Sequence, residues 1–219
     1  MKRGIFVATV LLIAGCKAPL PRPAAPPESS SIEELAAAVA EDARRIDLTS
    51  DPAVRAQIAA DAAGSAQACL DRAPQAAACL YAHALALGLE AQAHPLHANE
   101  TLKAMLDALG RAEAADPEYD QAGPARVRAL VLIRAPGWPL GPGDADSGLA
   151  AARRAVSLRP EYPPNVLALA DALGKTGDTR GAKETYLRAQ LLIQAMPPSS
   201  DRDAWLRQAD QALGRVQPR

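Results

Sequence analysis

Histidine and carboxylate side chains come close together at one point of the sequence, as a metal site would require. His94 and His97 follow Glu90 at the end of an alanine-rich stretch. Two ligands on one helix must share a face of that helix, but Pro95 interrupts the helix between the two histidines. We therefore expect a solvated loop at this point and no metal site.

A second pattern, formed by Asp144, Asp146 and Gly148, resembles part of a calcium-binding loop. The pattern fails because Leu149 replaces the invariant glycine and Ala155 replaces the bidentate acid of such a loop. The sequence also lacks the G-x-S-x-G, H-E-x-x-H, Walker and dinucleotide-binding motifs. We expect neither a cofactor nor enzymatic activity.

Cys16 stands where an apolar run ends. Lys2 and Arg3 precede the uncharged run Gly4–Gly15, which is too short to span a bilayer, since a helical span needs roughly 20 residues. The run ends in Leu-Ile-Ala-Gly before the cysteine, which resembles a bacterial lipobox. This resemblance implies a signal peptide over residues 1–15 and acyl chains on the Cys16 thiol and amine. An ordinary signal peptide with a chance cysteine is the alternative.

The lipid would anchor the mature protein to a membrane, because each buried acyl CH₂ group contributes roughly 0.8 kcal/mol. Lys17 follows the cysteine, whereas lipoproteins kept at the inner membrane often carry aspartate there, so the resemblance favours a periplasmic protein on the outer membrane. Residues 16–30 then form a proline-rich tether, because such a composition stays extended. Its prolines are Pro19, Pro21, Pro23, Pro26 and Pro27.

Cys69 and Cys79 are the cysteines that remain after lipidation. In an oxidising periplasm two such residues suggest a disulfide. A turn at Pro74 between two antiparallel helices would bring them face to face, although two free buried thiols stay open as an alternative. Redox chemistry is disfavoured because the sequence has no C-x-x-C motif.

The composition favours a helical protein that does not bind nucleic acid. Hydrophobic residues make up 49% of the chain and aromatic residues only 3%, and much of the apolar content is alanine. The formal net charge is −1, whereas a nucleic-acid interface needs a basic stripe with aromatic side chains. The composition therefore argues against a nucleic-acid-binding protein.

Capping signals and proline positions divide residues 31–219 into nine helices. Ser31 with Glu34 forms a capping box, and Asp51 before Pro52 marks the start of the second helix. Short loops make successive helices antiparallel, so the predicted fold is all-α, with helix pairs stacked as a tetratricopeptide-like α-solenoid. After the second helix the expected spans are 74–93, 98–115, 121–134, 145–158, 164–176, 179–195 and 201–215.

An internal repeat supports the solenoid over a plain helical bundle, which is the alternative. The segment Asp116–Tyr119 recurs as Arg159–Tyr162, 43 residues later, whereas a tetratricopeptide repeat has about 34 residues. The last helix pair fits the tetratricopeptide pattern of small residues that let helix axes approach. The matching positions are Leu169, Ala170, Leu173, Ala182, Tyr186 and Ala189.

The surplus residues lie in a loop over 135–144, which contains the sequence Ala-Pro-Gly-Trp-Pro and cannot be helical. Over Cys69–Ala195 the chain resembles the TatT-type lipoproteins, tetratricopeptide-like T components associated with TRAP (tripartite ATP-independent periplasmic) transporters. This resemblance implies helices that enclose a cleft or pore for a small apolar ligand and that dock onto a solute-binding protein. It rests on this loop and on Ala122, Gly123, Pro124, Arg126, Gly143, Asp144, Pro163, Pro164 and Asn165.

Four residues are candidates for binding a ligand or partner. Trp138 lies in the proline-rich loop, where it is either a plug that closes the gap between two helices or an anchor for a ligand or partner. Arg126 and Arg134 either neutralise helix ends or reach a carboxylate ligand. Asn165 follows two prolines and is either a binding residue or a cap of its own helix. We also expect the loop to force the helices apart and so create the cleft.

Three functions compete at this point. The first is a TRAP-associated binding lipoprotein, the second is a general scaffold lipoprotein that binds a peptide or protein during envelope assembly, and the third is an enzyme without a recognisable motif. Neighbouring genes for a solute-binding protein and a permease would favour the first. The sequence leaves the ligand, the partner and the formation of homo-oligomers open.

Overall fold

The computed structural model describes residues 26–216, so the predicted signal peptide, Cys16 and most of the predicted tether lie outside the described residues. Within 26–216 the chain forms nine α-helices and no β-strand, as the sequence predicts. None of these helices combines the length and the apolar composition needed to cross a membrane. The helices are α1 (Ile32–Arg45), α2 (Pro52–Arg72), α3 (Ala77–Ala93), α4 (Ala98–Ala115), α5 (Tyr119–Arg134), α6 (Ala145–Leu158), α7 (Pro163–Lys175), α8 (Thr179–Gln194) and α9 (Ser200–Val216).

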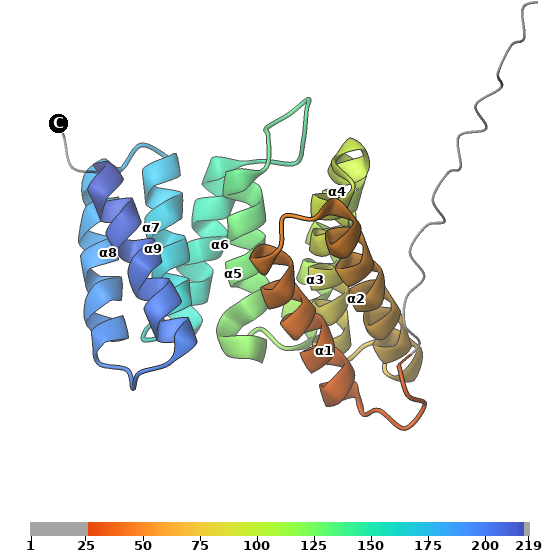
Figure 1. The fold of residues 1–219 in the computed structure, drawn as a ribbon. Helices are drawn as coiled ribbons and strands as arrows, with labels where there is room; N and C mark the ends of the chain where they lie inside the picture. The colour runs from red at the N-terminus through yellow and green to blue at the C-terminus, as the bar shows by residue number, and fades with distance from the viewer. Residues whose placement is uncertain (1–25, 217–219) are drawn as a thin grey trace, which may run out of the picture.

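Successive helices pack side by side in antiparallel pairs, and α9 closes the end of the stack (Figure 1). The odd-numbered helices also contact one another in order, α1 with α3, α3 with α5, α5 with α7 and α7 with α9. They therefore form one continuous face of an α-solenoid. Figure 1 shows α1 and α9 on the viewer's side of this face, one on each side of α5.

The repeat positions of the last pair lie in one hydrophobic core between α7, α8 and α9. Ala170, Ala182 and Ala189 are fully buried there, with Leu173 and Tyr186 packed beside them. Because alanine has almost no side chain, the axes of α7 and α8 can approach closely while the larger residues fill the remaining groove. The prediction of these core positions is confirmed.

The predicted helix starts are mostly correct. Ser31 accepts a hydrogen bond from the Glu34 amide while the Glu34 side chain accepts one from the Ser31 amide, and Asp51 caps α2. Such caps satisfy amides that have no partner within the helix. The third helix differs, because α3 begins at Ala77 and the residues around Pro74 form a turn.

The predicted disulfide is present. Cys69 near the end of α2 and Cys79 in the first turn of α3 are bonded to each other, and both are fully buried. Leu35 of α1 packs against them in the same small hydrophobic cluster. The covalent bond therefore holds the α2–α3 turn at the point where α1 covers it.

The last residues of the predicted tether are bonded to the helical domain. The Arg72 guanidinium, at the end of α2, donates hydrogen bonds to the backbone oxygens of Pro27, Glu28 and Ser30. These contacts lie just before the predicted start of the helical domain at residue 31. The helical domain already holds the chain from Pro27 onwards.

The loop between α5 and α6 does not force these helices apart. A Cβ atom at Gly148 of α6 would lie 2.5 Å from Ile133 Cγ2 of α5, so the two helices touch directly at this glycine. The loop folds on itself through a hydrogen bond from the Gly143 amide to the Pro136 carbonyl. Trp138 is 90% exposed, so the prediction that it plugs a gap between helices is wrong.

Candidate functional site

A groove of about 810 Å³ lies on the face formed by the odd-numbered helices. Side chains from α1 and α9 form its two walls, and α3 and α5 contribute its floor. The floor and the α9 wall are aromatic, with Tyr81, Tyr119, Tyr162 and Trp205, whereas the α1 wall consists largely of alanine. The α1 wall therefore offers small side chains, and the opposite wall and the floor offer aromatic rings.

Arg126 of α5 is the central charged residue of the groove floor. Its Nη2 atom lies 2.7 Å from Asp120 Oδ2, and its Nη1 atom donates to the carbonyl oxygens of Asp120 and Gln121 at 3.1 and 3.2 Å. Nη1 also donates to Asn165 Oδ1 at 3.1 Å. Both terminal nitrogens of the guanidinium therefore have acceptors within the protein, and one of these acceptors is a carboxylate.

The carbonyls that Arg126 binds belong to a left-handed turn at the start of α5. Asp120, Gln121 and Ala122 have φ values of 47°, 57° and 63°. Left-handed backbone costs roughly 1–2 kcal/mol for each residue with a side chain, so this turn needs support from its surroundings. The guanidinium of Arg126 provides it.

Gly123 and Pro124 fit the point where the chain returns to a right-handed helix. A Cβ atom at Gly123 would lie only 2.8 Å from the Tyr81 hydroxyl, so a larger residue would displace the tyrosine. Pro124 lies in the first turn of the right-handed segment, where its missing amide hydrogen costs little. The Gly-Pro pair therefore allows Tyr81 to approach the backbone of α5.

Asn165 supports the same turn from α7. Its Nδ2 atom donates to the carbonyls of Gln121, Ala155 and Arg159 at 2.9, 3.2 and 3.2 Å. The side chain is fully buried and joins the turn to the C-terminal end of α6. Tyr162 occupies the cap position of α7, so the prediction that Asn165 caps its own helix is wrong.

Aromatic side chains surround the ion pair. Tyr81 donates a hydrogen bond from its hydroxyl to Asp120 Oδ2 at 3.0 Å and packs edge-on against Tyr119. The Arg126 guanidinium lies 5.2 Å from the centre of the Tyr162 ring, which in turn contacts Trp205 edge-on. Burial raises the pKa of the Tyr81 hydroxyl well above its usual range, and the adjacent Asp120 carboxylate adds to the effect. Tyr81 therefore remains a hydrogen-bond donor at any physiological pH.

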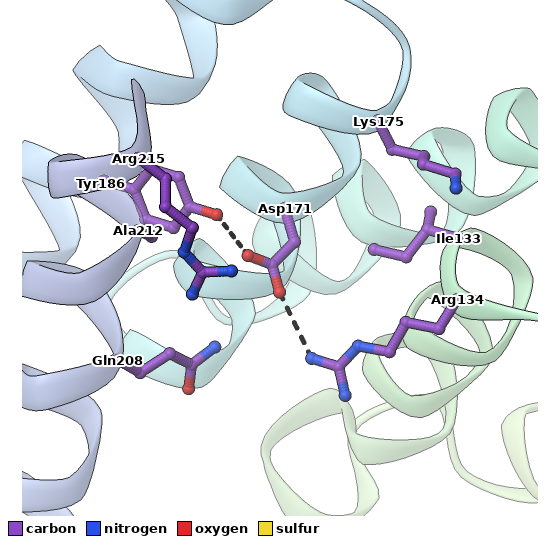
Figure 2. Close-up of a pocket in the computed structure, with 8 residues that line it drawn as sticks. All are labelled: Ile133, Arg134, Asp171, Lys175, Tyr186, Gln208, Ala212 and Arg215. Atoms are coloured by element: carbon purple, nitrogen blue, oxygen red, sulfur yellow. Dashed lines mark hydrogen bonds and ion pairs between the residues drawn. The ribbon is translucent and has the colours of Figure 1, made fainter. Parts of the chain in front are cut away.

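The structure brings Arg126 and Asn165 together, and it places Arg134 and Trp138 elsewhere. Arg134, at the end of α5, donates to Asp171 Oδ2 at 3.3 Å in a separate cleft between α5, α7 and α9 (Figure 2). A smaller cavity of about 230 Å³ is lined by both arginines and so lies next to the cleft and to the groove. Trp138 lines none of these three cavities.

Sequence reasoning missed four residues of the groove floor and wall: Tyr81, Asp120, Tyr162 and Trp205. They lie on four different segments, and the pattern of each segment alone indicates only an ordinary helix. One sequence pattern could have identified Tyr162, because Tyr119 and Tyr162 both follow Pro-Glu in the internal repeat. That repetition places an aromatic residue at the same point of two successive helix pairs.

The remaining polar candidates have structural roles. Asp144 caps α6 by accepting hydrogen bonds from the amides of Asp146 and Ser147, and the Ser147 hydroxyl also donates to it. These bonds lower the pKa of the Asp144 carboxyl.

Within residues 26–216 no group of three or more histidine, cysteine, aspartate or glutamate side chains is placed to hold a metal ion.

No protein-family model matches the chain, and a comparison with curated proteins finds no significant match.

Proposed function

We propose that the chain is a lipid-anchored periplasmic binding and assembly protein of the type that it resembles, a T component associated with TRAP transporters. The observation that supports this proposal is the aromatic groove of about 810 Å³ between α1 and α9. Ligand sites usually occupy cavities of roughly 300–1,000 Å³ that are lined mainly by apolar and aromatic side chains. The groove has both properties.

The charges of the groove favour a small, largely apolar ligand. Asp120 offsets the charge of Arg126, and both terminal nitrogens of Arg126 already have acceptors. A charged ligand would have to replace these contacts, whereas an apolar ligand would pack on the rings of Tyr162 and Trp205 without disturbing them. The rim charges are also close to balanced, with Glu33, Asp47 and Asp201 against Arg44 and Arg207.

The exposed loop between α5 and α6 supports a docking role in the same proposal. Trp138 and Leu140 are 90% and 77% exposed, which is unusual for large apolar side chains at neighbouring positions. A rigid loop that presents a tryptophan is typical of the central contacts of protein interfaces. We assign this loop to the contact with the solute-binding protein.

Native mass spectrometry of protein purified from its own periplasm tests the ligand. We expect a co-purified small molecule that is lost from Trp205→Ala, since Trp205 lines the groove. Trp138→Ala is the matched control, because Trp138 lies outside the groove, and this variant should retain the molecule. Loss of the molecule from both variants, or from neither, would contradict the assignment of the groove.

A general scaffold that binds a peptide is the second candidate, and one observation favours it. The groove shares Arg126 and Trp205 with the small cavity, which shares Arg134 and Gln208 with the cleft, so an extended chain could follow all three. Cross-linking in intact cells separates the two functions. A solute-binding protein captured through the 135–144 loop supports the transporter role, and a different protein captured through the groove supports the scaffold.

The lipid anchor has a direct test. Cys16→Ser removes the thiol that would carry the acyl chains, so the variant should appear in the soluble periplasmic fraction, whereas the natural protein stays with the membrane. Intact-mass measurement of the natural protein should show the added acyl chains. Their absence would contradict both the anchor and the proposed location.

A further inference from the structure

The cleft between α5, α7 and α9 has a different chemistry from the groove. Its volume is about 530 Å³, and its polar lining consists of Arg134, Asp171, Lys175, Tyr186, Gln208 and Arg215. In Figure 2, Arg134 approaches from α5 while Gln208 and Arg215 approach from α9, and all three side chains extend towards the space beside Asp171. Four helices, α5, α7, α8 and α9, therefore direct polar groups to one place.

The cleft carries more positive than negative charge. Arg134, Lys175 and Arg215 face a single carboxylate, that of Asp171. Within the described residues the Lys175 ammonium makes no hydrogen bond or ion pair, and the Arg215 side chain donates only to the backbone oxygen of Gln211 at 3.2 Å. Two cations are therefore left without a carboxylate partner.

Asp171 does not neutralise these two cations, because other groups already use its oxygens. The Tyr186 hydroxyl donates to Asp171 Oδ1, and Arg134 donates to Oδ2 at 3.3 Å. Burial raises the pKa of the Tyr186 hydroxyl, and its bond to Asp171 raises it further, so Tyr186 stays protonated as a donor. Asp171 thus fixes Arg134 and leaves Lys175 and Arg215 available.

The walls of the cleft can also hold carbon atoms. Ile133 and Ala212 are buried on opposite helices and face the same space as the charged groups. Two guanidinium groups suit carboxylate or phosphate oxygens, because their N–H groups form a planar fork that matches such oxygens in pairs. The Gln208 amide adds an uncharged donor or acceptor.

We propose that this cleft binds a small organic dianion, a dicarboxylate or a phosphate monoester, whose charge matches the excess of two cations. Arg134 and Arg215 would bind its oxygens, Lys175 would add charge at the entrance, and Ile133 and Ala212 would contact its carbon atoms. This inference does not depend on the proposed function of the groove, because the two cavities have different linings.

Isothermal titration calorimetry on the full-length lipoprotein in neutral detergent tests the proposal, with succinate, phenyl phosphate and inorganic phosphate as probes. We expect succinate or phenyl phosphate to bind more tightly than inorganic phosphate, and binding to weaken as salt screens the charges. Whichever organic probe binds more tightly identifies the anionic group. Inorganic phosphate that binds as tightly as both organic probes would contradict an organic ligand.

Matched variants locate the binding. Arg215→Gln and Lys175→Gln should each weaken the binding of the better probe at least about fivefold, because each removes one uncompensated charge. The controls are Arg128→Gln and Lys183→Gln, which change exposed residues outside the cleft and should leave the affinity unchanged within about twofold. Equal effects in both pairs, or no binding of either organic probe, would overturn the proposal.

Discussion

Arg126 and Arg134 lie on the same helix, two turns apart, yet they have opposite roles. The Arg126 side chain is 10% exposed and binds one carboxylate, two backbone carbonyls and one amide oxygen. The Arg134 side chain is 61% exposed and makes a single ion pair at 3.3 Å. The difference shows that the number of partners already present, rather than the residue type, decides whether an arginine is available to a ligand.

The same contrast separates the two cavities. In the groove, the polar groups of the floor serve the left-handed turn of residues 120–122, and the floor and walls offer a ligand mainly aromatic and alanine surfaces. In the cleft, Lys175 and Arg215 have no carboxylate partner within residues 26–216. One face of the solenoid therefore combines an apolar site with a cationic one.

The largest expected effect comes from Arg126→Met. This change keeps the apolar stem but removes the hydrogen bonds of Arg126 to two carbonyls of the strained turn and its ion pair with the Asp120 carboxylate. Asp120 is partly solvated, so we expect a loss of about 3 kcal/mol in the free energy of unfolding, the lower end for a broken buried pair. Urea denaturation measures it. The control Arg128→Met should change stability by less than about 0.5 kcal/mol, and similar losses would contradict a structural role for Arg126.

Asn165→Ala should have the next largest effect. It removes the donor for three carbonyls at a fully buried position, which we expect to cost about 2 kcal/mol. Because Asn165 also bonds directly to Arg126, the double variant should lose less than the sum of the single losses, by at least about 0.5 kcal/mol. Additive losses in urea denaturation would show that the two residues do not act as one unit.

Arg134→Met should affect stability much less than Arg126→Met. The Arg134 ion pair is exposed to solvent, so its removal should cost less than about 1 kcal/mol. The same variant should weaken dianion binding in calorimetry, because it removes one of the two guanidinium groups of the cleft. If Arg134→Met lowers the free energy of unfolding as much as Arg126→Met does, then Arg134 also has a structural role and the contrast between the two arginines is wrong.

Trp138→Ala should have the smallest effect on folding. An exposed side chain contributes little to stability, so we expect a change of less than about 0.5 kcal/mol, against about 2–5 kcal/mol for the buried Leu173→Ala. Affinity for the solute-binding protein should nevertheless fall by at least about 1 kcal/mol. Thermal unfolding and a pull-down titration measure the two quantities. If Trp138→Ala binds the solute-binding protein as tightly as the natural protein does, the loop is not part of this interface.

Most of the fold could be predicted from local signals. Ser31, Asp51 and Pro52 mark helix starts because they satisfy or avoid free amides, and these effects depend only on neighbouring residues. The disulfide could be predicted because a short turn fixes where Cys69 and Cys79 meet. Such features do not require knowledge of distant parts of the chain.

The groove could be predicted only in part, because it depends on contacts between distant segments. The left-handed turn begins at Asp120, where the sequence has no glycine to indicate a positive φ, and its support comes partly from Asn165 on another helix. Of the two alternatives for Trp138, the plug is wrong, because Gly148 lets α5 and α6 touch and leaves no gap to fill. A glycine at that position was the signal for close packing.

The positions of the two tryptophans make the groove accessible to fluorescence spectroscopy. Trp138 is 90% exposed, whereas Trp205 is partly buried and contacts Tyr162 in the groove. These are the two tryptophans of the sequence, so Trp138→Phe leaves Trp205 as a single indole reporter. The emission of Trp205 would shift towards the blue when a ligand displaces water from the α9 wall. Ligand binding could thus be followed without an added dye.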